Sequence, residues 1–148
     1  MGEFKPPIVA FHFALDCSGM LMGGFQKVSG LSVEFDVVEY KASGAKGEEL
    51  IIFQPGRQKP TKITLERGMT DTNMEMQTWI KQVQDGQIKA ARKNGSIMAY
   101  NQEHTEVARW NFENAWPNKV DWGGFDSGQN QAQIEKMELT VERLVRAS

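Results

Sequence analysis

Residues 31–38 read Leu-Ser-Val-Glu-Phe-Asp-Val-Val, so that Leu31, Val33, Phe35 and Val37 alternate with mostly polar neighbours. A period of two places these four side chains on one face of a β-strand. This is the clearest strand signal in the chain, and it predicts a strand with one buried, apolar face. The protein is therefore expected to contain β-strands that cover a shared core.

The same alternation recurs on both sides of this stretch. Further strands are expected over residues 8–15, 50–53, 62–66, 97–100, 107–114 and 137–142. Only one segment has a helical period: Thr72 and Glu75 match a capping box, Trp79 lies on an apolar stripe, and Gly86 suits a helix end. Many short strands with turn signals and a single helix predict an antiparallel barrel or sandwich.

The length and net charge of the chain limit the number of domains and the classes of ligand that we expect. A chain of 148 residues is expected to form a single domain, 1–148. With 17 Lys and Arg against 19 Asp and Glu, it lacks the basic excess that tight nucleic-acid binding requires. Neither a signal peptide nor an apolar run near the ~18 residues of a membrane span is expected. We therefore expect a chain that is made and kept in the cytoplasm, or that leaves it by a route other than ordinary secretion.

The residues that could carry enzymatic chemistry are few. Cys17 could pair with His12 or His104 as a nucleophile and base, but no local motif supports this pair. The Cys and His spacings of known metal sites are absent, so we expect no cofactor and no structural metal. Trp116 and Trp122 leave open a small β-barrel binding module for a sugar or a peptide.

A set of short motifs, in a fixed order, resembles one family. The motifs are Phe25–Leu31, Glu39-Tyr40, Pro55-Gly56, Ile63–Gly68, Trp110–Phe112, Asn114–Pro117 and Ile134–Glu142. Together they resemble the tail tube (inner tube) proteins of contractile phages and of phage-tail-like contractile injection systems.

The resemblance implies a structural protein and not an enzyme. Its fold would be mainly β, with two packed antiparallel sheets forming a barrel-like sandwich and one flanking α-helix, as in the type VI secretion tube. Six copies would form a ring, and stacked rings would make a channel for DNA or protein cargo. The implied partners are other copies of the chain, the contractile sheath, a baseplate hub or spike, and a tube terminator, in a virion tail or injection particle.

Two groups of residues are candidates for the assembled state. Residues 41–49 are polar and Gly-rich with no period, which predicts an exposed loop, and the resemblance implies that it reaches a neighbouring subunit or ring. These candidate interface residues are Lys41, Ala42, Ser43, Gly44, Ala45, Lys46, Gly47, Glu48 and Glu49. Four carboxylates, of Glu34, Asp36, Glu138 and Glu142, are candidates for the channel wall, where they would repel an acidic cargo. A solvated outer surface is the alternative for them.

Overall fold

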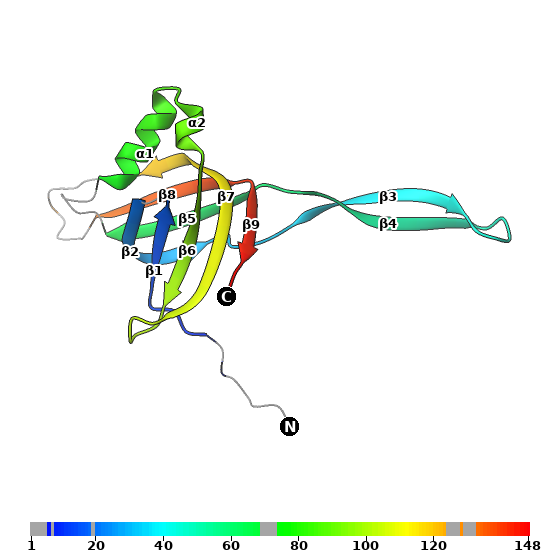
Figure 1. The fold of residues 1–148 in the computed structure, drawn as a ribbon, viewed down its shortest axis with the longest axis horizontal. Coiled ribbons are helices and arrows are strands. Elements are labelled where there is room, and N and C mark those ends of the chain that lie inside the picture. Colours follow the sequence, from blue (N-terminus) through cyan, green and yellow to red (C-terminus); the bar gives the residue numbers. More distant parts are fainter. Residues whose placement is uncertain (1–5, 7, 19, 69–73, 124–127, 129–132) are drawn as a thin grey trace.

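The computed structural model describes residues 6, 8–18, 20–68, 74–123, 128 and 133–148. Most of these residues lie in strands (Figure 1). The strands are β1 His12–Cys17, β2 Met20–Ser29, β3 Phe35–Ser43, β4 Glu49–Gln58, β5 Thr61–Gly68, β6 Lys93–Tyr100, β7 Glu106–Asp121, β8 Ile134–Val141 and β9 Arg143–Arg146. The helices are α1 Glu75–Gln84 and α2 Ile88–Ala91.

Seven strands form one antiparallel sheet that closes on itself. The strand order is β6-β1-β2-β5-β8-β7-β9, and β6 also pairs with β7, so six strands return to their starting point as a barrel. Because closure pairs the strand edges with one another, it removes most of the exposed N–H and C=O groups that an open sheet presents. Among the described strands, β9 pairs only with β7 and keeps one open edge.

The barrel interior is filled by the residues that the period of two had predicted. On β5, Ile63 and Leu65 are fully buried, and on β8 Met137, Leu139 and Val141 are buried as well. These two strands pair in the register Ile63 to Leu139 and Leu65 to Met137. The alternation predicts the inner face correctly because the neighbours that cover these side chains belong to the same chain.

Two helices lie against one side of the barrel, where a single helix was expected. The indole N–H of Trp79, fully buried on α1, donates to the carbonyl of Ala91 on α2 at 2.6 Å. The second helix has only four residues, too few to show a helical period in the sequence. Neither helix, nor any other in the described part of the chain, is long and apolar enough to cross a membrane.

The expected capping box of Thr72 and Glu75 lies partly outside the described residues. The helix begins at Glu75, with Met74 at the N-cap position and no side-chain cap, and Thr72 lies outside the described residues. The carboxylate of Glu75 contacts Arg67 on β5 instead. This charge-assisted contact with a buried guanidinium determines where the Glu75 side chain lies.

The second sheet is a hairpin of β3 and β4 that extends away from the barrel (Figure 1). The expected class, mainly β with two antiparallel sheets in a barrel-like arrangement, is therefore confirmed, but one sheet makes the barrel and the other projects from it. The strand predicted over residues 31–38 begins only at Phe35, and its apolar face is not buried: Val33, Phe35 and Val37 are 50%, 49% and 69% exposed. The alternation of residues 31–38 indicates an apolar face, but it does not indicate whether the same chain or another chain covers that face.

The loop predicted over residues 41–49 is strand at both of its ends. Residues 41–43 end β3, Glu49 begins β4, and only residues 44–48 form the turn between them. The turn is closed by hydrogen bonds from the Gly44 amide to the Glu48 carbonyl and from the Gly47 amide to the Gly44 carbonyl. A strand whose two faces are both exposed carries no apolar alternation, so the sequence pattern looks like that of a loop.

Candidate assembly interface

One face of the β3–β4 hairpin is almost entirely apolar. Residues that are paired across the two strands point to the same face, and the pairs on this face are Val38 with Gln54, Tyr40 with Ile52 and Ala42 with Leu50. We call it the apolar face, defined by Val38, Tyr40, Ala42, Leu50 and Ile52. Val38, Tyr40 and Leu50 remain 47%, 42% and 44% exposed, because no other element of the described chain covers them.

The opposite face of the hairpin combines apolar and charged groups. On it, Glu39 pairs with Phe53 and Lys41 pairs with Ile51. Phe53 is 65% exposed. The Lys41 ammonium lies 3.3 Å from a Glu49 carboxylate oxygen, with both side chains largely in water. Such an exposed ion pair contributes about 0–1 kcal/mol, so it does not hold the hairpin together by itself.

A hairpin of this kind is suited to being covered by another chain. An isolated two-stranded hairpin is only marginally stable in water, and no other strand in the described part of the chain pairs with this one. Contiguous exposed apolar side chains on a soluble protein mark surfaces that bind other proteins. The predicted interface residues 41–49 form the far end of this hairpin, and the apolar face extends the candidate interface toward the barrel.

The root of the hairpin is held by polar contacts that use two of the candidate channel residues. The Lys59 ammonium lies 3.2 Å from a Glu34 carboxylate oxygen and 3.7 Å from one of Asp36. The hydrogen bond to Glu34 and the two negative charges raise the pKa of Lys59. The Thr61 hydroxyl, where β5 begins, donates to the Ser32 carbonyl at 2.9 Å. These contacts join the chain segments at the root of the hairpin, and the ion pairs among them are exposed and add little stability.

The other two candidate channel residues lie elsewhere on the barrel. Glu138, on the outward face of β8, accepts a hydrogen bond from the Asn118 amide at 2.9 Å and lies 3.9 Å from the Lys62 ammonium. Glu142, between β8 and β9, accepts from the Asn114 amide at 2.7 Å. The structure therefore separates the four carboxylates: Glu34 and Asp36 lie at the hairpin root, Glu138 on the outer face of β8, and Glu142 between β8 and β9. Their place on a channel wall stays a prediction.

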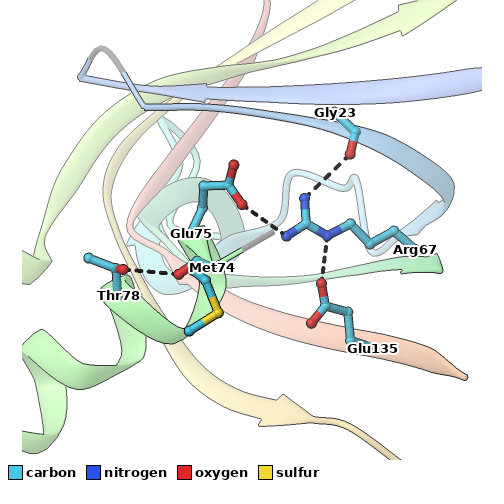
Figure 2. A network of polar contacts seen from close by, with 6 residues as sticks. All are labelled: Gly23, Arg67, Met74, Glu75, Thr78 and Glu135. Carbon is cyan, nitrogen blue, oxygen red and sulfur yellow. Dashed lines mark hydrogen bonds and ion pairs between the residues drawn. The ribbon is translucent and has the colours of Figure 1, made fainter. Parts of the chain in front are cut away.

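A buried ion pair lies inside the barrel beside the start of α1 (Figure 2). The Arg67 guanidinium, on β5, donates to Glu135 on β8 at 2.7 Å and to Glu75 on α1 at 3.3 Å. It also donates to the Gly23 carbonyl at 3.4 Å and stacks over the Phe25 ring. The side chains of Arg67 and Glu135 are 2% and 1% exposed. One guanidinium thus connects three strands and a helix.

Both members of this ion pair stand at inward positions of their strands, but charged residues at such positions are not expected to be buried. Arg67 continues the inward alternation of Ile63 and Leu65, and Glu135 precedes Met137 on the inward face of β8. Charged residues are assigned to the surface by default, because they are almost never buried unless paired. The partner could not be identified, since nothing in the sequence places the two residues opposite each other.

The structure does not assemble a nucleophile–base pair. Cys17 and His12 lie at opposite ends of β1, beside Gly95 and Tyr100 respectively. The Cys17 thiol is fully buried, and burial raises its pKa to about 12, so it holds almost no thiolate near neutral pH. Within the described residues, no group of three or more His, Cys, Asp and Glu side chains could hold a metal ion.

The two tryptophans considered for a sugar or peptide site do not line a pocket suited to a sugar. Trp116 lines a cavity of about 240 Å³ between the helices and β7, together with Val83, Ile88, Ala91 and Arg92. Sugar recognition needs several convergent polar groups, and this lining is nearly all apolar. Trp122 is partly buried in the segment after β7. Neither residue supports the binding-module alternative.

Comparison with known proteins places the chain among tube components. The model of the family described as T4-like virus tail tube protein gp19 matches residues 9–145. The tube–sheath structure of an extracellular contractile injection system, PVC, contains a chain that is 26% identical, with a TM-score of 0.76, covering 96% of this chain and 92% of that one.

Two further structures agree with this comparison. A chain of the anti-feeding prophage tube-terminating cap is 25% identical, with a TM-score of 0.78 and coverage of 100% and 95%. Hcp1 from Flavobacterium johnsoniae shares the fold at 17% identity, with a TM-score of 0.51 and coverage of 93% and 95%. A search among curated proteins gave no match.

Proposed function

This chain belongs to the T4-like virus tail tube protein gp19 family, and on that basis we propose that it is the structural subunit of the inner tube of a contractile tail or injection system. The observation that carries the proposal is a match over residues 9–145, together with a barrel that leaves one long hairpin uncovered. The family is structural, and the protein acts by assembling and not by catalysis.

Assembly into rings requires two different surfaces on each copy. A closed ring forms when one patch meets a different patch on the next copy and the rotation returns to its start. The described chain offers two unlike strand edges for this, the outer edges of the β3–β4 hairpin and the open edge of β9. Pairing such edges between copies satisfies their N–H and C=O groups. Six copies per ring is the number that the family resemblance implies.

The hairpin is the proposed contact with a neighbouring subunit or ring. Residues 41–49 at its tip would reach the neighbour, and the apolar face would supply most of the buried area. Each exposed apolar side chain that becomes fully buried contributes about 1.5–3 kcal/mol at most, so several small contributions combine over the five residues of this face. We infer from this that the apolar face, more than the polar tip, determines the strength of the contact.

The partners follow from the same proposal. Neighbouring structures include a sheath–tube complex and a tube-terminating cap, so we assign the sheath, a tube terminator and a baseplate hub or spike as partners of this chain. DNA or protein cargo would pass through the channel. The chain would be made in the bacterial cytoplasm and assembled there into a tail or an extracellular particle, with all 148 residues acting as one tube domain.

The four candidate channel carboxylates complete the proposal. Glu34, Asp36, Glu138 and Glu142 would give the channel wall an acidic character that keeps an acidic cargo from adhering. Their contacts with Lys59 and Lys62 reduce the net charge that they present. A density map of the assembled tube tests this directly: carboxylates that all lie outside the channel would refute the assignment, while the tube function would stand.

Electron microscopy of assembly variants tests the function and the hairpin separately. The purified chain, alone or with baseplate components, should form rings or hollow filaments of uniform width. Replacing residues 41–49 by a two-residue turn, or introducing Leu50→Asp on the apolar face, should abolish tubes while circular dichroism shows an intact barrel.

Two controls make these results specific. Gln102→Asp adds the same charge in the exposed turn between β6 and β7, and should leave the tubes unchanged. Normal tubes from the hairpin variants would refute the role of the hairpin but not the tube function. A wild-type chain that stays monomeric with baseplate components present would refute the tube function itself.

A further inference from the structure

The two histidines of the chain lie against each other on the barrel. His12 and His104 are the only histidines in the sequence, and their ring centroids are 5.1 Å apart with the ring planes at 53°. His12 begins β1, and His104 lies in the turn between β6 and β7. The pairing of β1 with β6 is what brings these two distant positions together.

Both rings are held in place by their surroundings. His12 pairs in register with Tyr100, and the two rings stack at 5.1 Å with an angle of 10° between their planes. The turn that carries His104 is closed by the Asn101 side chain, which accepts hydrogen bonds from the Glu103 and Thr105 amides at 2.9 and 3.0 Å. An ordered turn therefore keeps the His104 ring beside His12.

The ring nitrogens of both residues are available. In the described part of the chain, neither imidazole takes part in a hydrogen bond or an ion pair, and their only recorded contacts are between rings. His104 is exposed and His12 is half-buried, so both rings can be reached from solution. Neutral imidazole with a free nitrogen is the commonest protein ligand for transition metals.

The spacing of the rings is that of two ligands on one tetrahedral ion. Zn–N bonds are about 2.0–2.1 Å, and the centre of an imidazole ring is about 1.1 Å farther along, so each centroid would lie about 3.2 Å from the ion. At a tetrahedral angle the two centroids would then be about 5.2 Å apart. The observed separation is 5.1 Å.

We propose that His12 and His104 form a two-imidazole site for a divalent transition-metal ion, Zn²⁺ or Cu²⁺, with water in the remaining positions. Imidazole favours these ions, whereas Mg²⁺ and Ca²⁺ prefer oxygen ligands. With only two protein ligands the ion exchanges freely and is not needed for folding. The site is independent of the tube function, because it uses neither the hairpin nor the candidate channel carboxylates.

Calorimetric titration of the untagged, metal-free protein with Zn²⁺ tests the site. The wild type should bind one ion per chain, and His12→Phe or His104→Phe should each weaken binding at least about tenfold, since even the loss of a group that merely supports a ligand costs 10–100-fold. Phenylalanine preserves the ring packing and removes only the nitrogens. Tyr100→Phe is the matched control and should change the affinity less than about twofold.

Independent readouts separate metal binding from ring packing. Cu²⁺ added to the wild type should give a visible absorption band that both His→Phe variants lose, while Mg²⁺ should give no heat. Thermal unfolding without metal should be nearly the same for the wild type, His12→Phe and Tyr100→Phe, and somewhat lower for His104→Phe because His104 has φ +62°. Wild-type protein that binds no stoichiometric Zn²⁺, or His→Phe variants that bind it unchanged, would overturn the proposal and leave the two rings as aromatic packing only.

Discussion

Replacing Glu135 by Gln should be one of the most damaging single substitutions in the barrel. The change keeps the shape of the side chain but removes the charge that faces Arg67 at 2.7 Å, where both side chains are at most 2% exposed. Breaking a buried ion pair by removing one partner costs about 3–5 kcal/mol, because the other charge stays buried without compensation. Glu75 remains 3.3 Å from the guanidinium and is one-third exposed, so part of the compensation persists.

We therefore expect a loss near the lower end of this range, about 3 kcal/mol in the free energy of unfolding. For a domain of this length each kcal/mol shifts the melting temperature by about 2–4 °C, so the midpoint should fall by roughly 6–12 °C. Urea unfolding of the unassembled chain, followed by tryptophan fluorescence and by circular dichroism, measures the loss. The matched control is Glu113→Gln, which removes the exposed partner of Arg143 and should cost less than about 1 kcal/mol.

A double substitution distinguishes charge burial from packing. Arg67→Met combined with Glu135→Leu removes both charges and should recover most of the stability that Glu135→Gln loses, because apolar residues of similar volume often replace buried pairs without cost. The reasoning is refuted if Glu135→Gln costs no more than Glu113→Gln. It is also refuted if the double variant is less stable than the single one.

Three further substitutions probe other parts of the fold. Gly30→Ala should destabilise the fold by roughly 1–3 kcal/mol, because Gly30 has φ +86° and a methyl group there would overlap a backbone carbonyl of β5. The control in the same urea experiment is Gly68→Ala, where a methyl group meets open space. Trp79→Phe should cost roughly 1–3 kcal/mol, since it leaves the Ala91 carbonyl without its donor, and the loss should appear as a lower melting temperature. Cys17 should resist thiol reagents at pH 8 until the chain unfolds. Burial raises the pKa of this thiol from 9.0 to about 12, so its contribution to stability is full below pH 9 and is lost as the pH rises toward 12. In Cys17→Ala, the free energy of unfolding should no longer show this loss between pH 9 and 12.

The barrel could be predicted from the sequence because its side chains are covered by the same chain. Ile63, Leu65 and Met137 alternate with polar residues, and the structure buries them as the period requires. Val33 and Val37 follow the same rule yet stay exposed, since a periodic pattern does not say which chain supplies the cover. The exposed turn at residues 44–48 could be predicted from its polar, Gly-rich composition, whereas the exposure of the apolar face could not.

The buried ion pair could not be predicted from the sequence, for a different physical reason. Arg67 and Glu135 stand at inward positions, but the energy that keeps them there depends on an opposite charge on a distant strand. A pattern read along one strand contains no information about the strand beside it. The helix α2 was missed for a different reason, because four residues are shorter than the shortest repeat that a helical period can reveal.

The projecting hairpin has a consequence for the kinetics of growth. A two-stranded sheet without support is only marginally ordered, so its first contact with another free subunit costs ordering entropy in addition to the usual cost of association. A finished ring presents several docking surfaces at once, so the entropy lost when the hairpin becomes ordered is offset by more contacts. Free subunits should therefore stay apart in the cell, growth should start with a lag, and a preformed end should abolish that lag.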